Sequence, residues 1–159
     1  MKINKLYPYS IIMLMFILPI ASVIIERLIS EKNFALWDSV GKWFLLWSIG
    51  VRLLTAGLKQ VVNPWFTLQA IFNINNCESY VVVRELGISN ICKGLVGIIS
   101  FFIPQWRVVG AFMGGLYFGI AGLQHIIKKQ DSTNERVAMF SDVFLFIIMT
   151  TYILHMIYV

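Results

Sequence analysis

Residues 95–127 read LVGIISFFIPQWRVVGAFMGGLYFGIAGLQHII. Two apolar runs are separated here by one short turn, Pro104 to Arg107, in which a proline and two polar side chains interrupt the hydrophobic sequence. Each run continues away from the turn for about 20 residues, which is the length that an α-helix needs to cross a bilayer. The stretch therefore predicts a transmembrane hairpin, with one span over residues 80–103 and the next over residues 108–127.

Outside this hairpin, three more apolar runs are long enough to cross a membrane. All five runs are predicted to pack as one all-α domain over residues 1–159, a polytopic membrane helical bundle, because no soluble domain or linker separates them. The predicted spans, in chain order, are residues 8–25, 43–62, 80–103, 108–127 and 137–159.

Local signals add detail between and within these spans. Pro19 predicts a kink in the first span, because proline removes a backbone donor and clashes with the preceding turn. Residues 30–42 mix charged and aromatic side chains and are predicted to form an interfacial connector. Asn63 and Pro64 have the residue types of a helix cap and of a first helical position. Residues 63–73 are therefore predicted to form a short amphipathic helix that lies in the interface.

The composition is that of a membrane protein. Of the 159 residues, 58% are hydrophobic and 13% are charged, against roughly 45–50% and 25% in soluble domains. This excludes a secreted enzyme, a nucleic-acid-binding module and a disordered regulator, which all need long solvated stretches. The net charge of +5 comes from basic residues that occur singly or in pairs between apolar runs. We interpret them as loop and headgroup charges, with membrane lipids and no nucleic acid as partners.

The basic residues also indicate an orientation. With the N-terminus inside, the cytoplasmic segments hold six of them and the outer segments hold four. The positive-inside rule then predicts a multi-pass protein of the cell inner membrane with a cytoplasmic N-terminus. The six are Lys2, Lys5, Lys59, Lys128, Lys129 and Arg136, and the four are Arg27, Lys32, Lys42 and Arg107.

Polar residues inside the spans are predicted to gather at one depth. Successive spans run in opposite directions, so the end of one span and the start of the next lie in the same half of the membrane. Ionisable groups in a bilayer normally face the bundle interior and pair with one another, which makes them candidate functional residues. The same pairs are also explained if they only neutralise each other and fix the register of the helices. The predicted set is Arg52, Glu85, Asn90, His125 and Asp142, with Arg52–Glu85 and His125–Asp142 as the pairs.

Among these residues, His125 is the candidate for proton transfer. Histidine titrates near neutrality, and Asp142 in the neighbouring span is placed to fix its tautomer. A metal site would have to use His125, Asp142 and Glu85, but the sequence lacks HExxH or similar spacing, so no metal is predicted. Cys77 and Cys92 form no CxxC motif and are interpreted as packing thiols. No cofactor is indicated.

Glycines recur in the third and fourth spans. Small residues at helical spacing let transmembrane helices approach each other closely. Glycines beside polar and aromatic side chains also fit the lining of a lipid- or quinone-sized cavity, and the sequence leaves both interpretations open. The candidate packing residues are Gly94, Gly97, Gly115, Gly119 and Gly122.

The runs ELGISNICKGLVGIIS (residues 85–100) and GLYFGIAGLQH (residues 115–125), followed by Asp142, resemble a family of small bacterial inner-membrane proteins of unknown function. They are also loosely similar to the DoxX-like four-helix membrane proteins. The resemblance implies a four-helix core, with the first apolar run as a peripheral addition, and no established activity. The chain departs from the family at residues 59–60, a lysine and a glutamine, where members often carry a histidine. The positions carried over are Glu85, Gly87, Asn90, Gly94, His125 and Asp142.

Three classes of function remain open at this point. The favoured one is an integral membrane protein that binds a lipid-like or other amphipathic molecule in an inner-leaflet polar pocket. The second is an accessory subunit of a larger membrane complex, or a homo-oligomer, that docks through the glycine face of the fourth span. The third is a membrane-embedded isomerase or redox-linked enzyme that transfers protons through His125 and a carboxylate.

Overall fold

The predicted all-α membrane bundle is confirmed. The computed structural model describes residues 6–30, 35–68, 77–127 and 133–158. All of its described elements are helical. Within these ranges five helices are long and apolar enough to cross a membrane, over Pro8–Ile29, Leu36–Val62, Tyr80–Phe102, Pro104–Ile127 and Glu135–Tyr158.

Several of the spans are built from more than one helical element. The first consists of α1 (Leu6–Ile12), a π-helical segment η1 (Met13–Ile17) and α2 (Leu18–Ile29). The second consists of α3 (Leu36–Phe44), a π-helical segment η2 (Leu45–Val51) and α4 (Arg52–Val62). The remaining elements are α5 (Pro64–Thr67), the 3₁₀ turn η4 (Cys77–Ser79), α6 (Tyr80–Phe102), the 3₁₀ turn η5 (Pro104–Trp106), α7 (Arg107–Ile127) and α8 (Thr133–Tyr158).

The first two spans differ locally from the prediction. Residues 36–42 were expected in an interfacial connector, but they form the first turns of α3 and extend the second span. No proline interrupts this stretch, so nothing in the sequence ends the helix before residue 62. At Pro19 the chain stays helical, and η1 ends two residues before it. A π-helical turn changes the hydrogen-bond pattern, which accommodates the missing donor of the proline.

The predicted helix cap at Asn63 is confirmed. The Asn63 side-chain oxygen accepts a hydrogen bond from the backbone N–H of Phe66 at 3.3 Å, and Pro64 occupies the first turn of α5. The element α5 covers Pro64–Thr67 and Leu68 continues in a π-helical conformation, while the rest of the predicted helix, up to residue 73, is not described. Residues 69–76 lie outside the described part of the chain.

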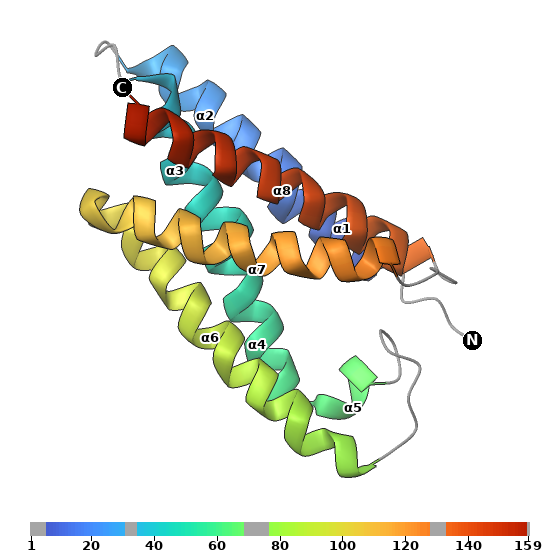
Figure 1. The fold of residues 1–159 in the computed structure, drawn as a ribbon. Coiled ribbons are helices and arrows are strands. Elements are labelled where there is room, and N and C mark those ends of the chain that lie inside the picture. Colours follow the sequence, from blue (N-terminus) through green and yellow to red (C-terminus); the bar gives the residue numbers. More distant parts are fainter. Residues whose placement is uncertain (1–5, 31–34, 69–76, 128–132, 159) are drawn as a thin grey trace.

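The spans form two groups that meet at one end of the molecule. In Figure 1, α8 runs beside α1 and α2, α7 packs along α8, and α4 pairs with α6. We call the end where α8 finishes and η5 lies the C-terminal end, and the other the N-terminal end. The α4–α6 pair and α7 meet near the C-terminal end and separate toward the N-terminal end (Figure 1).

The first span belongs to the core and is not the peripheral addition that the resemblance implied. Ile11 is 3% exposed and Met15 is completely buried. Both pack in the central cluster with residues of η2, α7 and α8. The fully buried members of that cluster are Met15, Leu45, Ile49, Ala111, Leu145, Met149 and Tyr152.

Glycines bring the backbone of the second span, in η2 and α4, into direct contact with α6. A Cβ atom added at Gly94 would lie 2.5 Å from the Leu54 backbone nitrogen and 2.8 Å from the Gly50 carbonyl oxygen. At Gly97 it would lie 2.6 Å from the Gly50 nitrogen, and at Gly57 it would lie 2.5 Å from the Gly87 carbonyl oxygen. Gly94 and Gly97 therefore act as packing residues, as one of the two interpretations predicts.

The nearest atoms to the α7 glycines on α8 belong to side chains. At Gly119 an added Cβ would meet the Phe146 ring at 2.6 Å, and at Gly122 it would meet Val143 Cγ2 at 3.0 Å. At Gly115 its nearest contact would be Met149 Cβ at 3.2 Å. These positions create the α7–α8 contact, but with more room to adjust than the glycines of α6.

Candidate functional site

A buried ion pair lies near the middle of the bundle. Arg52 Nη2 is 3.2 Å from Asp142 Oδ1, with side-chain exposures of 13% and 6%. The Ser141 hydroxyl donates to the Ala138 carbonyl oxygen at 2.8 Å and lies 3.4 Å from the same carboxylate oxygen. The α4 cation and the α8 anion thus neutralise each other in a region where an unpaired charge is costly.

Arg52 joins four of the five spans. Its Nη1 donates to Met15 Sδ of the first span at 2.9 Å. Its guanidinium carbon lies 4.8 Å from the centre of the Phe118 ring on α7, within the range of a cation–π contact. The arginine is therefore held by a carboxylate, a thioether and an aromatic face at once.

The predicted Arg52–Glu85 pair is wrong. Arg52 lies near the level of Gly94, because Gly94 packs against the backbone at residues 50–54. Glu85 is nine residues closer to the start of α6, or about 14 Å at 1.5 Å per residue. Glu85 is exposed, and Asp142 takes its place as the partner of Arg52.

His125 lies near Asp142, as expected for antiparallel neighbouring helices. His125 lies three residues after Gly122 on α7, and Gly122 packs against Val143 and Asp142. Glu85 is not part of this group. Within the described residues, no three His, Cys, Asp or Glu side chains are arranged to hold a metal ion.

Asn90 takes part in a separate polar contact between α4 and α6. Its Nδ2 donates to Gln60 Oε1 at 2.8 Å, and both residues are buried. Asn90 Oδ1 has no hydrogen-bond partner within the described ranges. The predicted set is thus divided in three: Arg52 with Asp142 and His125, Asn90 with Gln60, and Glu85 on the surface.

We expect the Gln60→Leu variant to lose about 1 kcal/mol of stability, since an interhelical hydrogen bond in a membrane contributes of this order. The variant leaves the Asn90 amide without its acceptor in a buried site. The double variant Gln60→Leu, Asn90→Leu removes both polar groups and should recover part of the loss. Unfolding of both in mixed micelles, followed by circular dichroism, measures the difference; equal stability of Gln60→Leu and the wild type would contradict the expectation.

A polar stripe on α6 was not predicted from the sequence as one group of residues. Glu85, Ser89 and Lys93 are spaced four residues apart and so lie along one side of the helix. Glu85 and Ser89 are exposed and Lys93 is half-buried. Lys93 Nζ donates to Ser89 Oγ at 2.6 Å, so the ammonium group points along the stripe toward Glu85. The regular spacing was the signal in the sequence.

The stripe connects to the ion pair through two aromatic rings of α7. Lys93 Nζ lies 4.1 Å from the centre of the Tyr117 ring. The Tyr117 and Phe118 rings are 5.2 Å apart in an edge-on arrangement, and Phe118 contacts Arg52. The two mid-membrane cations therefore lie on neighbouring aromatic side chains, but only Arg52 has a carboxylate partner within the described part of the chain.

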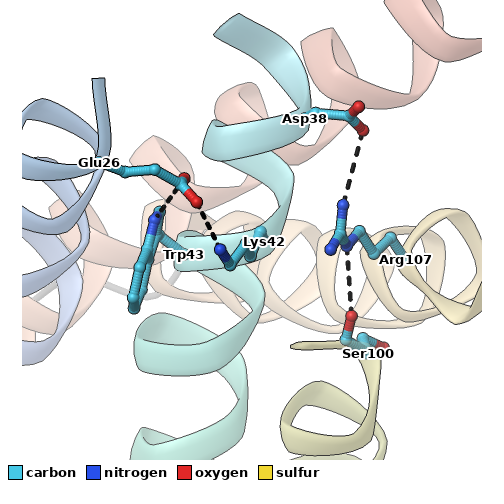
Figure 2. A network of polar contacts seen from close by, with 6 residues as sticks. All are labelled: Glu26, Asp38, Lys42, Trp43, Ser100 and Arg107. Atoms are coloured by element: carbon cyan, nitrogen blue, oxygen red, sulfur yellow. Dashed lines mark hydrogen bonds and ion pairs between the residues drawn. The ribbon is translucent and has the colours of Figure 1, made fainter. Parts of the chain in front are cut away.

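A second polar network lies at the C-terminal end, where the sequence analysis expected only headgroup charges (Figure 2). The Glu26 carboxylate accepts hydrogen bonds from Lys42 and, at 2.8 Å, from Trp43 Nε1. Arg107 Nη1 lies 3.6 Å from Asp38 Oδ1. Arg107 Nε also donates to the Ser100 carbonyl oxygen at 3.3 Å. These contacts link α2 to α3, α3 to α7 and α6 to α7.

Two further features belong to this end. A surface groove of about 400 Å³ is lined by Ser22, Ile25, Glu26, Ile29, Ser30 and Trp43. Glu26 is already bound to Lys42 and Trp43, so the groove offers mainly apolar contacts. The Tyr152 hydroxyl is buried without a hydrogen-bond partner among the described residues.

Comparison with family models, with curated proteins and with solved structures finds no match to this chain. The resemblance to the DoxX-like membrane proteins therefore stays a prediction.

Proposed function

We propose that this membrane protein binds an amphipathic, lipid-like molecule on the side of α6 that faces α7. The observation that supports the proposal is the polar stripe of Glu85, Ser89 and Lys93. It lies within a helix that is long and apolar enough to cross a membrane, yet two of its three members are exposed. Polar groups turned toward acyl chains are costly, so such residues normally have a partner or a function.

The surroundings of the stripe match an amphipathic molecule better than a purely polar one. Tyr117 provides an aromatic surface beside Lys93. Large apolar side chains on α7 near that surface are exposed, and they are Leu116, Ile120 and Leu123. A polar head at the stripe and an apolar tail along α7 would satisfy both kinds of surface.

Binding of an amphipathic molecule is the class of function that the sequence favoured, but the residues of the binding surface differ from the predicted set. Glu85 remains in the binding surface, and Ser89, Lys93 and Tyr117 join it. Asn90 and Asp142 are buried and bound to other side chains, so their role is to hold the helices together.

Native mass spectrometry of the purified protein tests the proposal. We expect one amphipathic molecule to stay bound to the wild type through detergent exchange, and to be identified by extraction. The Ser89→Leu, Lys93→Met variant should lose it, because both polar groups of the stripe are then apolar. The Thr55→Val, Lys59→Met variant is the control, since it removes a hydroxyl and a lysine from exposed positions of α4. A wild type that carries no lipid and runs as a defined oligomer would contradict the proposal and favour a protein partner.

A further inference from the structure

We propose that the molecule bound at the stripe is a singly charged anionic amphipath with a compact head, such as a long-chain fatty acid, and that Lys93 binds its carboxylate. This inference rests on the proposed function and specifies the chemistry of the same site. Its basis is the depth of Lys93, the balance of charge in the middle of the bundle and the geometry around the ammonium group.

The depth of Lys93 excludes a bulky headgroup. Lys93 lies 13 residues after Tyr80, the first residue of α6, and nine residues before Phe102, the last. At 1.5 Å per residue these separations are about 20 Å and about 14 Å, in a hydrocarbon core of about 30 Å. Its bond to Ser89 moves the ammonium by only one turn toward Tyr80. A phospholipid headgroup stays in the interfacial layer, whereas a carboxylate is small enough to enter.

The charge balance predicts a single negative charge. Arg52 and Asp142 cancel each other. Lys93 has a hydroxyl and an aromatic ring as its neighbours, and no carboxylate of the described chain lies within 4.0 Å of it. The backbone of Glu85 is two helical turns from that of Lys93, about 12 Å along the axis, and the ammonium, although drawn one turn toward it by Ser89, forms no ion pair with its carboxylate. One carboxylate beside Lys93 and Ser89 would neutralise the remaining cation through charge-assisted hydrogen bonds.

The position of Cys92 allows a direct measurement. Cys92 is exposed and adjacent to Lys93. In a Cys77→Ser chain it can carry a bimane fluorophore, which bromine atoms quench on contact. The labelled protein in detergent is titrated with 9,10-dibromostearate and, separately, with the alcohol that has the same brominated chain. Wild-type Lys93 should give saturable quenching by the acid at a concentration about tenfold lower than by the alcohol, as expected for a hydrogen bond between charged groups.

Two variants separate the possible results. Lys93→Met should remove the preference for the acid, whereas Lys59→Met should keep it. Lys59 is a suitable control because it is also a lysine over an aromatic ring, that of Phe66 at 3.4 Å. Equal, saturable binding of acid and alcohol to the wild type would overturn the anionic head but leave the amphipath site in place. If neither the brominated acid nor the brominated alcohol gives saturable quenching, the proposed function itself is overturned.

Discussion

Replacing Asp142 with leucine is expected to destabilise the protein by about 3–5 kcal/mol, the cost typical of breaking a buried ion pair by removing one partner. The Arg52 side chain is only 13% exposed and its nearest anion is Asp142, 3.2 Å away. A guanidinium stays charged in proteins. The variant would therefore bury a cation that keeps, among the described residues, its contacts with the sulfur of Met15 and the face of Phe118 but no carboxylate.

The measurement is reversible unfolding in mixed micelles, with tryptophan fluorescence and circular dichroism as independent signals. The double variant Arg52→Met, Asp142→Leu is the decisive control. It removes both charges and leaves apolar groups of similar volume, so it should regain most of the lost stability. If the double variant is as unstable as Asp142→Leu, the loss comes from packing around α8 and not from the unpaired arginine.

The ion pair also shows what the sequence is able to predict. Length and hydropathy are properties of single segments, and they located all five spans. The Asn63 cap is equally local and was predicted correctly. The partner of Arg52 depends instead on how far one helix is shifted and rotated against the next, which hydropathy does not encode. The glycine contacts between α4 and α6 set that shift, and they place Arg52 far from Glu85.

The missed residues have a related cause. Lys42 and Arg107 lie near helix ends, where basic side chains usually contact lipid headgroups. Only the packing of α2, α3 and α7 brings them to Glu26 and Asp38. Lys93 was visible as one of several polar residues in the third span, but its contact with Tyr117 depends on the angle between α6 and α7. Such contacts between spans are set by tertiary structure.

The second large effect is expected at Gly94. Replacing it with alanine should cost about 3 kcal/mol, the upper end of the range for overpacking a core. The added Cβ would lie 2.5 Å from the Leu54 nitrogen and 2.8 Å from the Gly50 carbonyl oxygen. Both atoms belong to the backbone of another helix, so no side-chain rotation relieves the clash and α4 must move away from α6.

Gly115→Ala is the matched control, because it makes the same chemical change in a glycine of the neighbouring span. Its Cβ would meet only Met149 Cβ, at 3.2 Å, so α7 and α8 need to separate there by only a few tenths of an ångström. We therefore expect a loss below about 1 kcal/mol there. Unfolding of both variants under the same micelle conditions compares them. Similar losses of stability would mean that any glycine-to-alanine change in a transmembrane helix has this cost. The positions of Arg52 and Lys93 in the membrane would then not be fixed by the backbone contact between α4 and α6.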